Sequence, residues 1–115
     1  MKGGMMHEQR EIVLIPFPYS DLTGTKKRPA LIISNSKINS TQDRICCLIT
    51  SQPTKEGIVL DSFDEGTLPF KSWVKPHRLF TISEKIIVKK LAKIEKKLYE
   101  TILKEINKNI EMDGK

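Results

Sequence analysis

The sequence predicts a mainly β protein with one C-terminal α-helix, folded as a small, strongly curved β-barrel. Three observations predict it: short apolar runs rich in β-branched residues, turn-forming residues between these runs, and one amphipathic helical pattern near the end of the chain. The 115 residues are enough for one hydrophobic core and not for two. We expect residues 1–9 to be a flexible leader and residues 10–112 to form a single domain.

The expected strands follow from the apolar runs and their boundaries. A polar loop at residues 19–27 follows the first run, and long loops in compact domains are often functional. The run at residues 31–33 is continuous and β-branched, which is typical of a strand buried on both faces. Residues 63–70 contain glycine and proline and are expected to form a loop. The runs predict strands at residues 11–17, 29–34, 44–50 and 57–60, short extended pieces at 71–74 and 78–82, and a last strand at 86–91.

The helical pattern occupies the end of the chain. Leu98, Ile102, Ile106 and Ile110 recur every four residues, which places them on one face of a helix. The positions between them are mostly charged or polar. This pattern predicts one amphipathic helix over residues 95–110 that packs on the sheet.

The charge balance favours an anionic partner. Twenty Lys and Arg against fourteen Asp and Glu give a net charge of +6 and a pI near 9.4. Such a balance suits a nucleic acid or an acidic protein, and it also occurs in ordinary soluble proteins. A DNA-binding regulator is a further alternative, but the sequence has no helix-turn-helix or recognition-helix pattern. Residues 71–97 hold only two acids (Glu84, Glu95) beside nine cations, Lys71, Lys75, Arg78, Lys85, Lys89, Lys90, Lys93, Lys96 and Lys97, so they attract a polyanion.

The two cysteines do not form a disulfide framework. Cys46 and Cys47 are adjacent, so on a strand their side chains point to opposite faces and cannot readily bond to each other. Their spacing is not that of a metal site, and we expect no metal and no cofactor. We interpret both as small apolar residues of a protein in the reducing cytoplasm. No apolar run has the length of a membrane span, and we expect no membrane association.

Arg28 stands at the start of the second expected strand. It follows Lys26 and Lys27 and precedes Pro29, whose ring fixes its own φ and biases Arg28 toward an extended conformation. A guanidinium held at a rigid strand end is positioned to bind an anion. The alternative is that Arg28 is an ordinary surface cation.

Several motifs together resemble the PemK/MazF family, toxins of type II toxin–antitoxin systems. They are Glu-Ile-Val-Leu-Ile-Pro-Phe-Pro at 11–18, Lys-Arg-Pro-Ala-Leu-Ile-Ile-Ser at 27–34, Leu-Ile-Thr-Ser at 48–51, Ser-Trp-Val-Lys-Pro at 72–76 and Leu-Phe-Thr-Ile at 79–82. With the C-terminal helix, the resemblance covers nearly the whole chain except the leader. The chain departs from the family at Arg10-Glu11, where Gly-Asp is common. It also has Lys75 and His77 where several relatives have an arginine and then an acid.

The resemblance implies an SH3-like barrel that forms a homodimer and acts as an mRNA interferase. Such an enzyme cleaves single-stranded RNA at short sequences without metal and leaves a 2′,3′-cyclic phosphate and a 5′-hydroxyl. The family's catalytic arginine and threonine correspond to Arg28 and Thr50, with Ser51 beside them. A cognate antitoxin with an acidic, flexible segment would block the RNA groove. The alternative is a non-catalytic barrel of the same fold that binds RNA or antitoxin.

The side chains suit this chemistry to different degrees. The Arg28 guanidinium can offset charge on the phosphate, but it cannot act as a base because its pKa exceeds about 12. Thr50 and Ser51 can donate hydrogen bonds to phosphate, and the alternative is that they only cap a strand end. His77 is a candidate general acid/base or base-contacting residue, because an unperturbed histidine has a pKa of about 6.5. The alternative is that it is a surface histidine. Further RNA contacts are expected from a base-stacking Phe70 and from the phosphate-binding candidates Lys26, Lys27, Lys75 and Arg78.

Overall fold

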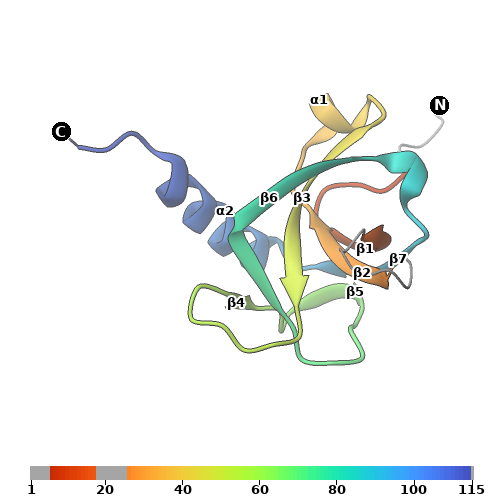
Figure 1. Cartoon of the computed structure of the whole chain (residues 1–115), viewed down its shortest axis with the longest axis horizontal. Helices are drawn as coiled ribbons and strands as arrows, with labels where there is room; N and C mark the ends of the chain where they lie inside the picture. The colour runs from red at the N-terminus through yellow and green to blue at the C-terminus, as the bar shows by residue number, and fades with distance from the viewer. Residues whose placement is uncertain (1–5, 18–25, 115) are drawn as a thin grey trace.

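One curved antiparallel sheet and one long helix make up the protein. The computed structural model describes residues 6–17 and 26–114. The sheet has seven strands in the order β4-β6-β3-β2-β1-β7-β5, and it curls into an open half-barrel (Figure 1). The predicted fold class, mainly β in an SH3-like barrel with a C-terminal helix, is therefore confirmed. The elements are β1 (Glu11–Phe17), β2 (Lys26–Ile32), α1 (Ser36–Asn39), β3 (Asp43–Thr50), β4 (Ile58–Val59), β5 (Phe63–Gly66), β6 (Trp73–Ser83), η1 (Glu84–Ile86), β7 (Lys89–Ile94) and α2 (Lys96–Ile110).

The three central strands are buried on both faces. Alternate side chains of a strand point to opposite faces, so β1, β2 and β3 contribute to two separate cores. The α2-side core contains Ile12, Leu31 and Cys47 with Val74, Tyr99, Ile102 and Ile106. The opposite core contains Val13, Ile15, Ala30, Ile32 and Cys46, covered by Phe80, Ile82 and Ile87. The expectation that the β2 run is buried on both faces is confirmed.

Strand β6 reaches both cores because it bends. We expected two short pieces separated at Pro76, whereas the structure has a single strand, Trp73–Ser83. Its pairing with β3 shifts register between Leu48, which lies opposite Lys75, and Cys47, which lies opposite Leu79. The intervening residues form a bulge, because proline has no N–H for the ladder and a bulge bends the strand that contains it. The first half of β6 therefore packs against α2, and the second half covers the opposite core.

The strands β2, β5 and β7 differ from their predicted positions. Strand β2 begins at Lys26, within the expected loop, and ends at Ile32 instead of residue 34. The loop expected over residues 63–70 begins with β5, which pairs with β7, and the last strand lies at Lys89–Ile94 instead of 86–91. Ser83 accepts a hydrogen bond from the Lys85 backbone N–H and caps the 3-10 turn η1, which delays the strand. Gly66 allows the close pairing of β5 with β7. It has a φ of +64°, and a Cβ there would lie 2.6 Å from the Leu91 carbonyl oxygen.

Helix α2 matches the predicted helix closely and packs on the face of the sheet that carries Ile12, Leu31 and Cys47. It buries Tyr99, Ile102 and Ile106, while Ile110, the last residue of the predicted stripe, is 68% exposed. Ile110 is exposed because the end of the helix extends beyond the sheet (Figure 1). No helix in the described part of the chain has the length and apolar character needed to cross a membrane.

Part of the expected leader contacts the barrel. The Arg44 guanidinium, in a residue only 3% exposed, donates hydrogen bonds to the main-chain carbonyls of Met6, His7, Thr41 and Asp43. Each carbonyl satisfies a buried donor, so the arginine is held without a carboxylate. Residues 1–5 of the leader lie outside the described residues.

A second set of hydrogen bonds ties the same segment to α2. The Gln9 side-chain amide donates to the Ile33 carbonyl and to the Tyr99 hydroxyl, at 2.9 Å each. The Tyr99 hydroxyl in turn donates to the Ile33 carbonyl at 2.8 Å. Burial raises the pKa of Tyr99, so this hydroxyl keeps its proton and remains a donor.

We predict that the two cysteines lower stability at alkaline pH. Both thiols are free and fully buried, one in each core, and burial raises the pKa of each from 9.0 to about 12. Between these values the unfolded chain loses thiol protons that the folded chain keeps. The free energy of unfolding should therefore fall as pH rises, by up to about 1.4 kcal/mol per pH unit for each thiol. Urea titrations from pH 8 to pH 11 of the wild type and a Cys46→Ala/Cys47→Ala variant would measure the difference, and equal slopes would contradict it.

We predict that Gly66→Ala destabilises the protein. The substitution places a methyl group against the Leu91 carbonyl and forces a non-glycine residue into a left-handed conformation. The free energy of unfolding should fall by about 1–3 kcal/mol. Gly114→Ala is the matched control, because a Cβ at Gly114 meets nothing within 4 Å. Chemical denaturation measures both variants, and equal stabilities would show that β5 has room to shift.

Candidate functional site

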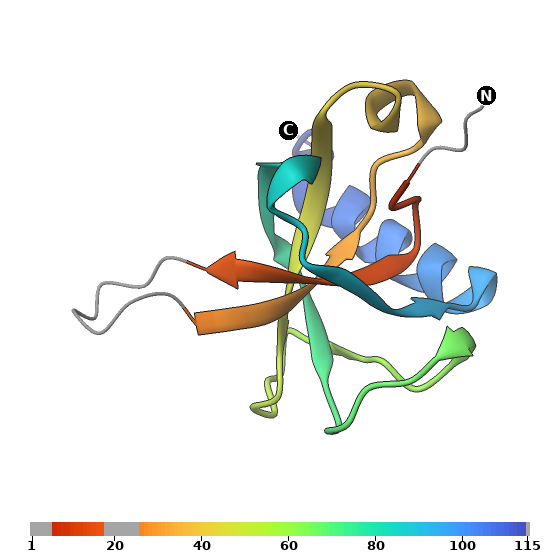
Figure 2. The same cartoon turned by 90° about the vertical axis from the view of Figure 1, so that its right-hand side faces the viewer.

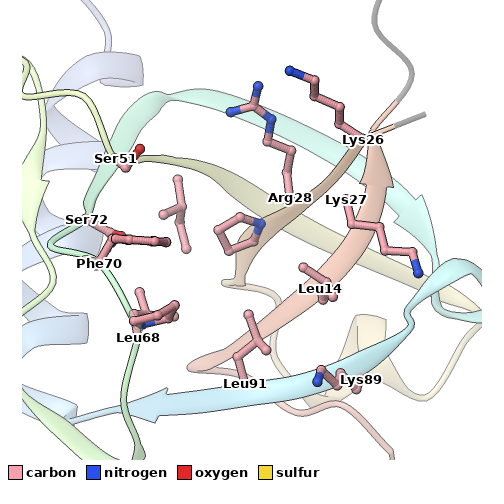
Figure 3. A pocket seen from close by; sticks show the side chains of 13 residues that line it. Leu14, Lys26, Lys27, Arg28, Ser51, Leu68, Phe70, Ser72, Lys89 and Leu91 are labelled. Carbon is pink, nitrogen blue, oxygen red and sulfur yellow. The ribbon is translucent and has the colours of Figure 1, made fainter. Parts of the chain in front are cut away.

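A cavity of about 510 Å³ lies at the start of β2 (Figure 3). Its walls come from β1, β2, the end of β3, the segment between β5 and β6, and the start of β7. One part is cationic and the other is apolar, and among the described residues no carboxylate lines it. The cationic residues are Lys26, Lys27, Arg28 and Lys89, the hydroxyls are Ser51 and Ser72, and the apolar residues are Leu14, Pro29, Ile49, Leu68, Pro69, Phe70 and Leu91.

Strand pairing positions Arg28. Strand β2 pairs with β1, with Arg28 opposite Ile15 and Pro29 opposite Leu14, and Figure 2 shows the two strands side by side as they leave the sheet. Pro29 fixes its own φ at the point where the strand enters the doubly buried region. Arg28 is half-buried, and its guanidinium lies on the same side of the cavity as Ser51 (Figure 3). The backbone of Arg28 is therefore fixed by the pairing of β2 with β1.

The two predicted hydroxyls lie at the end of β3. Ser51 is exposed and lines the cavity. Thr50 is the last residue of β3 and does not line the cavity itself. Its Oγ1 accepts a hydrogen bond from the Gln52 backbone N–H at 3.1 Å, which is a strand-end cap. A hydroxyl that accepts this bond still has its own proton to donate.

Phe70 stands at the apolar side of the cavity. Its side chain is 72% exposed, which is unusual for a large aromatic residue. The backbone beside it is fixed, because the buried Ser72 hydroxyl donates to the Phe70 carbonyl at 2.8 Å. The Ser72 carbonyl accepts a bond from the Leu60 N–H at 2.9 Å.

His77 lines a different cavity. It lies in the β6 bulge, exposed, beside a hollow of about 500 Å³ that is also lined by Glu56 and Glu105. Arg78 is exposed in the same bulge, and Lys75 is half-buried opposite Leu48. None of these three residues lines the Arg28 cavity. The structure thus brings together Lys26, Lys27, Arg28, Ser51 and Phe70, puts Thr50 next to them, and leaves Lys75, His77 and Arg78 elsewhere.

Apart from Phe70, sequence reasoning missed the apolar part of the site. Leu14 and Leu91 come from β1 and β7, and Leu68 comes from the segment that was expected to be a plain loop. Lys89 lies opposite Leu14 across the β1–β7 pair, so it faces the cavity, although it appears as one of many lysines in the sequence. Alternation along β1 was the available signal, because Val13 and Ile15 face one core and Leu14 must face the other way.

Comparison with known proteins identifies the family. A model of the PemK-like, MazF-like toxins of type II toxin–antitoxin systems matches residues 8–110, so the chain belongs to this family. The resemblance inferred from the motifs is therefore confirmed. No curated protein matches the chain.

Solved structures share the fold at low sequence identity. A mycobacterial endoribonuclease in complex with its cognate antitoxin is 13% identical with a TM-score of 0.76, over 95% of this chain and 99% of that one. A MazE–MazF structure from Deinococcus radiodurans (Form-II) is 17% identical with a TM-score of 0.77, over 93% and 97%. The Mycobacterium tuberculosis toxin MazF-mt6 is 16% identical with a TM-score of 0.72, over 90% and 99%. This protein is similar to all three in fold.

Proposed function

We propose that this protein is a metal-independent endoribonuclease that cleaves single-stranded RNA, including mRNA, at short sequences and acts as the toxin of a type II toxin–antitoxin system. One observation carries the proposal. In a chain of the PemK/MazF family, the Arg28 guanidinium, the Ser51 hydroxyl and three lysines (Lys26, Lys27 and Lys89) line one cavity. Such a cavity attracts and orients a phosphodiester.

The reaction is an internal transfer at phosphorus. The ribose 2′-oxygen bonds to phosphorus, the bond to the 5′-oxygen breaks, and a 2′,3′-cyclic phosphate and a 5′-hydroxyl result. The 2′-hydroxyl loses a proton to a base, and the leaving oxygen gains one from an acid. Arg28 offsets the charge that builds on the non-bridging oxygens, and its N–H groups can also donate toward the leaving oxygen.

The other candidate residues have supporting roles in this proposal. Thr50 and Ser51 donate hydroxyl hydrogen bonds to the phosphate, while Lys26 and Lys27 hold the RNA backbone. Lys75, His77 and Arg78 contact RNA outside the Arg28 cavity. For His77, a place in a separate cavity supports contact with a base over proton transfer beside Arg28.

A non-catalytic RNA- or antitoxin-binding barrel is the second candidate. It is favoured by the cap on Thr50 and by the described part of the cavity lining, which contains no histidine that could move a proton. In both cases the cations suit an acidic segment of an antitoxin that competes with RNA. We also propose that the protein works in the cytoplasm.

We predict that Arg28→Ala lowers RNA cleavage by about 100- to 1,000-fold, because the phosphate loses its fixed charged donor. Arg28→Lys should restore only part of this loss, since an ammonium keeps the charge without the planar fork. His77→Gln is the matched test of the second cavity and should change the rate much less. Primer extension on a long RNA measures both the rate and the sites of cutting.

The same assay separates the two candidate functions and tests the role of metals. Cleavage should persist in EDTA, and loss of activity on chelation would contradict the proposed mechanism. RNA cleavage and growth arrest that survive Arg28→Ala would remove Arg28 from the catalytic centre. RNA binding without any cutting by the wild type would support the non-catalytic barrel.

We also propose a homodimer, because a barrel of 115 residues can extend its groove only through a second copy. Sedimentation at micromolar concentration should give twice the mass of the chain. A stable monomer at that concentration would contradict it.

A further inference from the structure

The apolar half of the Arg28 cavity has no role in the chemistry at phosphorus. Leu14, Leu68, Leu91 and the exposed ring of Phe70 line this half, while Arg28 and Lys27 line the other (Figure 3). An aromatic side chain that is 72% exposed contributes little to folding. Its place at a cationic cavity indicates a ligand with an anionic part and a flat apolar part.

The position of Phe70 is set by the core. The Ser72 hydroxyl holds the Phe70 carbonyl at 2.8 Å, and Ser72 itself is only 6% exposed. Its carbonyl is bonded to the N–H of Leu60, a residue of the α2-side core. The ring is therefore carried on anchored backbone and not on a free loop, which suits a surface that receives a ligand.

One unpaired nucleotide has the matching chemistry. Its phosphate suits the cations, and its base suits an aromatic platform with leucine walls. The volume of about 510 Å³ lies within the range of small-ligand sites, about 300–1,000 Å³. A paired base cannot enter, because it must leave its stack first.

We propose that the apolar half of the cavity is a base subsite, in which one unpaired nucleobase stacks on Phe70 while the adjoining phosphate lies at Arg28 and Lys27. This inference rests on the proposed function. Ser72 is a positioning residue that holds the platform. The leucine and phenylalanine side chains have no group that reads a base edge, so the stacking contact itself requires a base but does not select among the four.

Abasic substitution tests the subsite. A cleavable oligonucleotide is prepared in versions that each lack the base at one position near the cut, and kcat/KM is measured with wild type and Phe70→Ala. One base stacked on an aromatic ring corresponds to about a 10- to 100-fold effect. Wild type should lose this factor at one position only. Phe70→Ala should show the same fall in kcat/KM on the intact RNA. Removing the base at that position should then lower kcat/KM no further, because the substitution and the missing base remove the same contact.

Control variants separate stacking from general damage. Phe70→Trp keeps an aromatic platform and should retain the loss of activity on the abasic RNA that Phe70→Ala removes. Ile110→Ala, which removes an exposed apolar side chain far along α2, should change nothing. Ser72→Ala should raise KM more than it lowers kcat and should weaken the abasic effect, and Ser72→Thr should restore both. Melting temperatures of each variant show whether the barrel remains folded.

The outcomes distinguish this inference from the proposed function. Additive effects of Phe70→Ala at every abasic position would overturn the subsite while leaving the nuclease intact. So would unchanged cleavage by Phe70→Ala combined with weaker inhibition by an acidic antitoxin, which would assign the surface to a protein partner. If the wild type cuts no RNA, the affinities of the same oligonucleotides test the subsite. Non-additive effects of Phe70→Ala and one abasic position on affinity would support the subsite without the nuclease. Additive effects at every position, or no binding, would overturn it.

Discussion

The burial of β2 on both faces is the constraint on which the rest of the structure depends. Leu31 and Ile32 are completely enclosed, one in each core, so the strand cannot slip by one residue without exchanging its two faces. A fixed register also fixes the residues at the start of the strand. Pro29 and Arg28 stand there, opposite Leu14 and Ile15. The geometry of the cavity is thus a consequence of packing that takes place some residues further along the same strand.

Charge is distributed so that the cavity stays positive. Elsewhere on β7 and the N-terminal segment, cations are paired: Lys90 with Glu65, Lys93 with Glu8, and Arg10 with Asp64. The hydrogen bond from Lys90 lowers the pKa of Glu65, which keeps that carboxylate charged. At the cavity, the lining within residues 6–17 and 26–114 holds the cations Lys26, Lys27, Arg28 and Lys89 and no acid. The excess of lysines over residues 71–97 is therefore less important to the site than the cations of β2.

Patterns of apolar residues located the strands β1 to β4 and α2, although β2 begins three residues before its predicted start and β4 is a two-residue strand with half-buried side chains. They failed at β5, where Asp64, Glu65 and Gly66 resemble a turn and only pairing with β7 makes the segment extended. They also divided β6 at Pro76, since a bulge and a break look alike in one dimension. The cationic side of the site was foreseeable from local sequence. Apart from Phe70, its apolar side was not, because Leu14, Leu68 and Leu91 come from three distant segments.

The contacts of Arg44 with the N-terminal segment use main-chain carbonyls, and this has a consequence for sequence variation. A carbonyl is present whatever the side chain, so residues 6 and 7 can change type without loss of these bonds. His7 has a φ of 64°, which excludes mainly β-branched residues at that position. The spacing between His7 and Glu11 is constrained, since adding or removing a residue there would carry both carbonyls out of reach of the guanidinium. The hydrogen bonds of Arg44 thus constrain the length of this segment and not its amino-acid composition.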